Sequence, residues 1–149
     1  TGCATRCPAT SPAGTRAAAE ATGGCPAGVT LATVLAAVEG VALWCPDVTL
    51  PVTGVVAADL MSDVLVDARP GYVLVTGLVN VQVIRTAAIA DLAAVVFARG
   101  KEVPAEVVEL ARQMNVPAFA SRESLFEAAG RLYAALGGGP AESVGHRRA

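Results

Sequence analysis

Short runs of apolar and β-branched residues recur in the middle of this chain, and stretches with helical periodicity separate them. Two of these runs, residues 72–76 (YVLVT) and 93–97 (AAVVF), contain no charged side chain. A strand that is apolar on both sides is typical of a parallel sheet with helices on both faces. The alternation therefore predicts βαβ units, and hence an α/β domain with a mainly parallel sheet flanked by helices on both faces.

The bounds of the expected elements follow from the same patterns. Helices are predicted at about 29–39, 60–66, 80–90, 104–114 and 124–136, and strands at 41–43, 52–57, 72–76, 93–97 and 116–120. We expect Gly40 to end the first helix and Asp59 to cap the second. Ser124 and Glu127 have the Ser-x-x-Glu spacing of a capping box. The order of the strands does not follow from these patterns.

The two ends of the chain differ in composition from its middle. Residues 1–28 hold three of the four cysteines and three prolines, but no Leu, Ile, Val, Phe, Tyr, Trp or Met that could form a core. The chain begins with Thr, and our hypothesis is that this stretch is a disordered or non-native extension: a tag, a linker or the product of a start site placed too early. Residues 137–149 are predicted to be a flexible tail, which leaves 29–136 as the domain.

Composition argues against several classes of protein. Only 16% of the residues are charged, the formal net charge is −2, and Lys and Arg are scattered, so nucleic-acid binding is not expected. No apolar run reaches the roughly 18 residues of a membrane span. Cys3, Cys7 and Cys25 form no CxxC pair and the single histidine is His146, so we expect no metal and no cofactor. Cys45 is expected to be a buried or half-buried apolar side chain, and a reducing cytoplasm suits such a chain.

Polar residues follow several of the predicted strands, at the sheet edge where α/β proteins bind ligands. Four loops are concerned: residues 58–63, 77–80, 99–101 and 121–124. Positive side chains, a glycine that lets a ligand approach the backbone, and free N–H groups at helix starts would together suit an anion. The candidate ligand-binding residues are Asn80, Arg85, Thr86, Arg99, Gly100 and Lys101, with Asp59, Ser62 and Asp63 as further candidates.

Simpler interpretations remain open for several of these residues. Asn80 and Asp59 could be helix caps, and the charges of residues 99–101 could be those of a solvated loop. Residues 82, 85 and 86 are expected to share one helix face, which suits either a wet surface or a partner. Three aspartates at 59, 63 and 67 have i, i+4 spacing, which suits a polar surface more than a cation site.

The sequence contains no complete catalytic constellation. The Arg-Gly-Lys run is not a P-loop, because no spaced glycine precedes it and Glu102 follows Lys101 where Ser or Thr would stand. The lone histidine lies in the expected tail, so a Ser-His or Cys-His pair has no usable base. We therefore expect a protein that is not an enzyme.

Four stretches resemble the DRTGG domain, a small bacterial module. They are residues 59–65 (DLMSDVL), 76–86 (TGLVNVQVIRT), 96–101 (VFARGK) and 126–133 (FEAAGRLY), and the resemblance covers about 29–136. It implies a regulatory role. DRTGG domains accompany catalytic or nucleotide-binding domains in long phosphotransacetylases and in some inorganic pyrophosphatases, and they are similar to the non-kinase, N-terminal domain of HPr kinase/phosphorylase. Of the name-giving residues, expected near 79–80 and 98–100, only Gly100 is present. The Arg85-Thr86 and Arg-Gly-Lys pieces instead resemble the short, free-standing branch.

The leading hypothesis is a non-enzymatic regulatory domain that senses a small anionic metabolite or nucleotide, such as an adenine nucleotide or a phosphometabolite. We expect a homodimer, both from the resemblance and because a mean hydropathy of +0.55 leaves apolar surface to be covered. One alternative is a protein-interaction subunit that docks on a metabolic or redox enzyme and binds no small ligand. A phosphotransfer enzyme is the third hypothesis.

Overall fold

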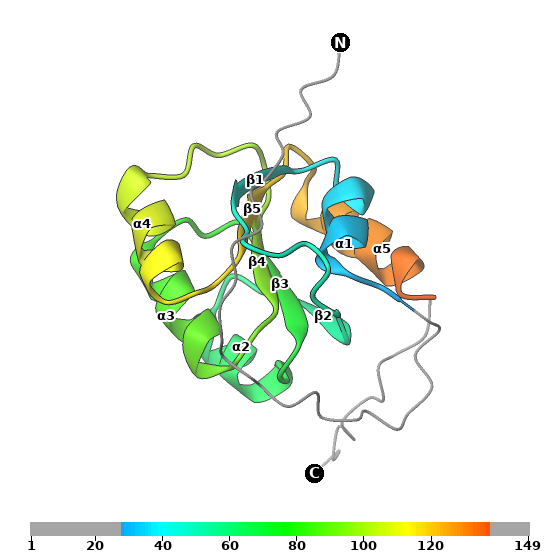
Figure 1. Cartoon of the computed structure of the whole chain (residues 1–149), viewed down its shortest axis with the longest axis horizontal. Coiled ribbons are helices and arrows are strands. Elements are labelled where there is room, and N and C mark those ends of the chain that lie inside the picture. Colours follow the sequence, from blue (N-terminus) through cyan, green and yellow to red (C-terminus); the bar gives the residue numbers. More distant parts are fainter. Residues whose placement is uncertain (1–27, 138–149) are drawn as a thin grey trace.

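Strands β3 (Tyr72–Thr76) and β4 (Ala94–Phe97), which correspond to the two uncharged runs, lie side by side inside a five-stranded sheet (Figure 1). The computed structural model describes residues 28–137. The sheet order is β1-β5-β4-β3-β2, where β1 is Val41–Trp44, β2 is Gly54–Ala57 and β5 is Ala118–Ala120. Strands β2 to β5 are parallel, and β1 pairs antiparallel with β5. The predicted α/β fold with a mainly parallel sheet is confirmed.

The helices of residues 28–137 cover both faces of the sheet. Helices α2 (Met61–Asp67), α3 (Val81–Ile89) and α4 (Ala105–Gln113) connect successive parallel strands and pack on one face. Because βαβ crossovers have one hand and the strands follow one another in order, all three crossovers reach the same side. Helices α1 (Leu31–Ala37) and α5 (Leu125–Ala135) contact each other and cover the opposite face (Figure 1).

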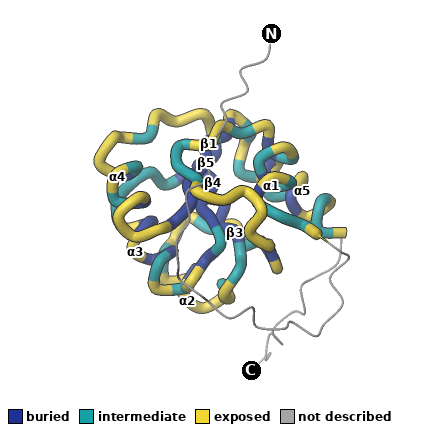
Figure 2. The backbone as a smooth tube through the Cα atoms, viewed as in Figure 1, coloured by how far each residue is buried: buried dark blue, intermediate teal, exposed yellow. Residues whose placement is uncertain are grey.

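Alternating side chains divide the core into two layers. In β3, Val73 and Val75 face α1 and α5, whereas Leu74 faces the other three helices. The two core phenylalanines also separate, with Phe119 in the first layer and Phe97 in the second. Figure 2 shows the buried strands between helices whose outer sides are exposed. Burial on both faces explains why the strands are apolar throughout.

Two helix ends differ from the prediction. The second helix has Leu60, not Asp59, at its N-cap, because the Asp59 carboxylate bonds to the neighbouring strand instead. At the end of α1 the left-handed residue is Glu39 (φ +48°), and the Gly40 N–H closes the helix by donating to the Leu35 carbonyl (3.0 Å). Gly40 is needed for another reason: a Cβ there would lie 3.0 Å from the carbonyl oxygen of Ala120 on β5.

Other local predictions are confirmed. The Asn80 side chain caps α3 by accepting from the Val83 N–H (3.1 Å), and Ser124 with Glu127 forms the capping box of α5. Cys45 is half-buried beside the α1–α5 layer. Apart from residues 28 and 137, the predicted extension and tail lie outside the described residues, and so do the other three cysteines and His146. Within residues 28–137, no helix has the length and apolar character that crossing a membrane requires.

Candidate functional site

Asp59 joins the carboxyl ends of β2 and β3. Its Oδ1 accepts hydrogen bonds from the Gly77 N–H (2.7 Å) and the Thr76 hydroxyl (3.1 Å). The bond from Gly77 is the largest cause that lowers the pKa of Asp59, and partial burial opposes it. Smaller contributions that lower this pKa come from Thr76, Arg99 and Lys101. A fixed negative charge therefore lies at the centre of the predicted ligand edge.

Arg99 reaches this carboxylate from the end of β4. Its Nη2 lies 3.5 Å from Asp59 Oδ2, and a Cβ on Gly77 would lie 3.0 Å from its Nε. The guanidinium therefore occupies space that only a glycine at position 77 leaves open. Arg99 has φ +71°, a left-handed conformation that costs a non-glycine residue about 1–2 kcal/mol. Backbone strain of this kind concentrates at functional sites.

Lys101 approaches the same glycine. Its Nζ donates a hydrogen bond to the Gly77 carbonyl oxygen (2.6 Å), which leaves two of the three ammonium donors for other acceptors. Arg99 and Lys101 thus converge on Gly77, and Arg99 is about half-exposed. The structure brings together these two predicted site residues with Asp59.

A small pocket of about 190 Å³ opens beside Lys101, between the start of β1, the end of β5 and the loops after β4 and β5. Its lining residues are Glu39, Val41, Gly100, Lys101, Ala120, Ser121 and Arg122. Two cations and one carboxylate face a volume well below the roughly 300–1,000 Å³ of a drug-sized site. The pocket suits one phosphate-sized group, with the rest of a ligand outside it.

A larger hollow of about 330 Å³ lies at the opposite edge of the sheet, between the ends of α3 and α4. Its lining includes Asp91 and the residues that follow α4, so it lies beside helix C-termini, which carry partial negative charge. The volume of this hollow would suit a small ligand, but the negative charge around it does not suit an anion.

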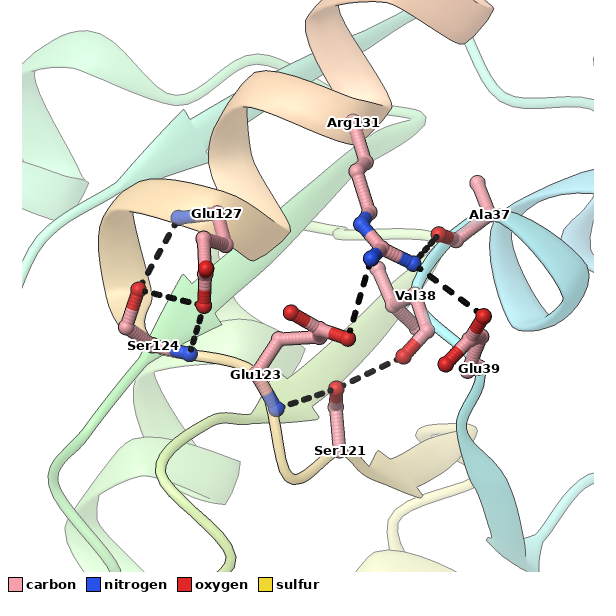
Figure 3. Close-up of polar contacts among 8 residues, drawn as sticks. All are labelled: Ala37, Val38, Glu39, Ser121, Glu123, Ser124, Glu127 and Arg131. Atoms are coloured by element: carbon pink, nitrogen blue, oxygen red, sulfur yellow. Dashed lines mark hydrogen bonds and ion pairs between the residues drawn. The ribbon is translucent and has the colours of Figure 1, made fainter.

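A network of polar contacts holds the floor of the smaller pocket (Figure 3). The Ser121 hydroxyl donates to the Val38 carbonyl (2.7 Å) and accepts from the Glu123 N–H (3.2 Å). Arg131 on α5 pairs with Glu123 (3.2 Å) and with Glu39 (3.5 Å). These contacts join the end of α1 to the loop that leads into α5, and they fix the position of Ser121 in the pocket wall.

Two of the other predicted site residues, Thr86 and Asn80, have structural roles. Thr86 is only 2% exposed, on the side of α3 that packs on the sheet, whereas Arg85 is exposed. The prediction that both share a face with Gln82 is therefore wrong, because Thr86 lies where the helix turns toward the core. Asn80 uses its side-chain oxygen as a cap. Ser62 and Asp63 are exposed on the first turn of α2.

The backbone donors of the Arg-Gly-Lys loop are not free. The Arg99 N–H donates to the Glu123 carbonyl (2.7 Å), and the Gly100 N–H donates to the Ser121 carbonyl (2.9 Å). These two N–H groups are therefore not available to an anion, because carbonyl groups of the loop after β5 accept both. Side chains, not backbone amides, supply the positive character of this pocket.

The aspartate alternative is not supported by the structure. Asp59 turns toward β3, and among residues 28–137 no group of three or more His, Cys, Asp or Glu side chains is placed to hold a metal ion.

Two arginines contribute to the pocket or to the contacts around it, and the sequence did not single them out. Arg131 stands four residues after Glu127, a spacing that indicates a pair within the helix, yet it pairs with Glu39 and Glu123. Arg122 belongs to a loop that was recognised, but nothing in its spacing indicated the pocket.

Comparisons with known proteins give a fold relationship. The sequence matches no protein-family model and no curated protein. A solved structure of the CBS and DRTGG domains of the regulatory region of Clostridium perfringens pyrophosphatase, complexed with its activator diadenosine tetraphosphate, matches with a TM-score of 0.56 at 15% identity. The match covers 72% of this chain and 47% of that one. It is consistent with a DRTGG domain.

This likeness of fold accords with the DRTGG resemblance of four sequence stretches. Three of those stretches supply the residues that converge here: Asp59, Gly77 and the loop 99–101. The chain spans about half the length of the matched regulatory region.

Proposed function

We propose that this chain is a non-enzymatic regulatory domain that binds a small phosphorylated metabolite or nucleotide at the carboxyl end of its sheet. The observation that carries the proposal is the convergence of Arg99 and Lys101 on Gly77 beside a pocket that Lys101 shares with Arg122. The activator of the matched regulatory region, diadenosine tetraphosphate, contains the chemical groups that such a site would recognise.

The charges give each residue a role in the proposed complex. Lys101 and Arg122 would contact a phosphate in the pocket, since both line it. Arg99 would contact a second phosphate or the adjoining part of the ligand, because its guanidinium lies against Gly77, whose carbonyl oxygen Lys101 contacts. Charge-assisted hydrogen bonds of this kind contribute about 1.5–3 kcal/mol each.

The carboxylates of Asp59 and Glu39 repel an anion, and this repulsion lowers the affinity of the site for a phosphate. Asp59 partly neutralises Arg99, so a phosphate must compete with a carboxylate for the guanidinium. Both side chains of that pair are about half-exposed, which makes the pair worth no more than about 1 kcal/mol. A phosphate with two negative charges can displace it.

Isothermal titration tests the proposal with inorganic phosphate, AMP, ADP, ATP and diadenosine tetraphosphate as titrants. Replacing Arg99 and Lys101 by Ala is expected to weaken the binding of any nucleotide that binds wild type by about tenfold or more. Arg112→Ala is the matched control, since Arg112 is an exposed arginine on α4 that pairs with Glu109. It should leave affinity unchanged.

Three outcomes contradict the proposal. If none of the titrants binds wild type, the protein-interaction alternative replaces it. If the double variant binds as tightly as Arg112→Ala, the ligand sits elsewhere. Release of phosphate from ATP by wild type with Mg²⁺, and its loss in the double variant, would instead favour the phosphotransfer hypothesis.

A further inference from the structure

The carboxylate of Glu39 lines the small pocket, although it does not suit a site for phosphate alone. The other charged residues that line this pocket are Lys101 and Arg122, and both attract an anion. A carboxylate beside them repels a bare phosphate. It accepts hydrogen bonds and donates none, so the group that it attracts is a donor such as a hydroxyl group. The pocket therefore combines side chains for a phosphate with one acceptor for a donor.

The stability of the fold does not account for a glutamate at position 39. Glu39 follows the C-cap of α1 with φ +48°, a left-handed conformation for which glycine is the usual residue. Its ion pair with Arg131 (3.5 Å) is largely exposed, and such a pair stabilises a fold by less than the left-handed conformation costs. Arg131 also has a closer partner, Glu123 (3.2 Å). A strained residue whose contacts do not offset the strain points to a role in binding.

The contact with Arg131 leaves much of the Glu39 carboxylate available to a ligand. Oε1 lies 3.5 Å from Nη1 of Arg131, and in Figure 3 the other carboxylate oxygen points away from the guanidinium. A carboxylate has about four acceptor sites, so one exposed ion pair does not use its full capacity. The Glu39 side chain is 73% exposed, which places it at the rim of the pocket. Arg131 thus holds the acceptor in position at this rim.

Val41 gives the same rim an apolar side. It is 67% exposed at the start of β1, and it lines the pocket together with Glu39. Ligand sites typically combine apolar side chains with a few polar groups that fix the orientation of the ligand. A sugar ring fits this pair, because it presents C–H groups on its faces and hydroxyl groups at its edge. A phosphate alone would use neither residue.

We infer that Glu39 is a specificity-determining residue of the pocket, whose carboxylate accepts hydrogen bonds from the hydroxyl groups of a sugar that carries the phosphate. The ligand class is then a phosphorylated sugar, either free or as the ribose of a nucleotide. The phosphate lies beside Lys101 and Arg122, and the sugar lies at the rim between Glu39 and Val41. This inference rests on the proposed function, because the phosphate must occupy the pocket for the sugar to reach Glu39.

Isothermal titration at low ionic strength tests the inference with ATP, its dideoxy analogue, which lacks both ribose hydroxyl groups, and inorganic triphosphate. Wild type is expected to bind ATP about tenfold more tightly than the dideoxy analogue, because a site built to bond a hydroxyl group rejects a ligand without it. Glu39→Ala should abolish this preference. The same variant should bind inorganic triphosphate about two- to fivefold more tightly than wild type, because the repulsion is gone.

The opposite signs separate recognition from a structural role. Damage to the pocket by Glu39→Ala would weaken all three ligands, whereas loss of the acceptor weakens ATP relative to its analogue and strengthens triphosphate. Glu39→Gln keeps the shape and one acceptor oxygen, so it should gain affinity for triphosphate and retain part of the preference. Glu109→Ala is the matched control, since it removes the same charge from an exposed ion pair on α4. It should leave the preference for ATP unchanged.

Each further outcome has a definite meaning. Equal affinity of wild type for ATP and its dideoxy analogue overturns the inference and leaves the proposed phosphate site intact, as does a Glu39→Ala variant that keeps the preference. If neither ATP nor inorganic triphosphate binds wild type, the proposed function fails and the inference fails with it. Where the inference holds, AMP and ribose phosphate distinguish the two sources of the sugar: tighter binding of AMP identifies a nucleotide, and equal binding identifies a free sugar phosphate.

Discussion

Asp59 shows how a single carboxylate serves both the fold and the candidate site. It accepts the Gly77 N–H and the Thr76 hydroxyl, and it holds Arg99 at 3.5 Å. These interactions lower its pKa below the ordinary value of 3.8. A group with a lowered folded-state pKa stabilises the fold fully above its unfolded pKa, and this contribution is lost as the pH falls through the folded-state value.

The Asp59→Asn variant separates the contribution of the negative charge of Asp59 from that of its hydrogen bonds. Asn keeps an acceptor for Gly77 but loses the charge, so we expect wild type to be more stable at pH 7 by no more than about 1 kcal/mol. The difference should shrink as the pH falls from 3.8, where the carboxyl group of the unfolded chain becomes protonated, toward the lowered pKa of Asp59 in the folded protein. Urea unfolding at pH 7 and at pH 3 measures it, and a difference that is constant across this range contradicts the assignment.

The same variant makes a prediction for the proposed function. Removing the carboxylate charge frees Arg99 from its competitor, so Asp59→Asn should bind a phosphorylated ligand several-fold more tightly than wild type. Titration of the nucleotide that binds wild type gives the comparison. A loss of affinity would mean that Asp59 contacts the ligand itself.

The backbone conformation of Glu39 determines how substitutions at this position change the stability of the fold. Its φ of +48° is strained for glutamate, and its side chain pairs with Arg131. Glu39→Ala removes the pair and keeps the strain, whereas Glu39→Gly removes both. We expect Glu39→Gly to be the more stable of the two by about 1 kcal/mol, measured by thermal unfolding. Equal stability of the two variants would show that this position carries no strain.

At the scale of elements, the loop between β5 and α5 depends on Ser121. This side chain is 3% exposed and bonds both the Val38 carbonyl and the Glu123 N–H. Ser121→Ala leaves both groups without their partner, so it should lower the free energy of unfolding by about 1–3 kcal/mol. Ser62→Ala, at an exposed position of α2, is the matched control and should cost less than about 0.5 kcal/mol. Equal effects in urea unfolding would contradict the role of Ser121.

The elements themselves were predictable because their patterns are local. Burial on both faces requires the uncharged runs of β3 and β4, and the Ser124 capping box marks the start of α5 within four residues. Asp59 was misjudged as a cap for a non-local reason: its partner Gly77 stands 18 residues later and on another strand. The Ser121 contact to Val38 spans 83 residues and has no local sequence pattern. The sequence predicts only that Arg99 and Lys101 lie at the same edge of the sheet. Their convergence on Gly77 does not follow from the sequence, because the directions of the two side chains depend on the left-handed backbone conformation of Arg99.

For the whole molecule, parallel strands were expected, but their order was not. Strand β1 follows α1 closely in the chain, yet it pairs antiparallel with β5, the last strand, at the edge opposite β2. The pairing places Val41 beside Ala120, residues that both line the small pocket. The pocket could not be predicted from the sequence, because it forms where β1 and β5, the first and last strands of the chain, lie side by side.

Residues that pack the described core lie between Val29 and Leu136 in both layers. The sequence outside this range offers almost no large apolar side chains, so little burial is expected from it. A chain reduced to residues 29–136 should therefore unfold with a melting temperature within about 3 °C of the full chain, equivalent to less than about 1 kcal/mol. Differential scanning calorimetry at equal molar concentration makes the comparison, because self-association raises the melting temperature as concentration rises. A broad, non-cooperative transition in the shorter chain would show that the core extends beyond these residues. An unchanged transition would place the whole folding unit, with the pocket, within 29–136.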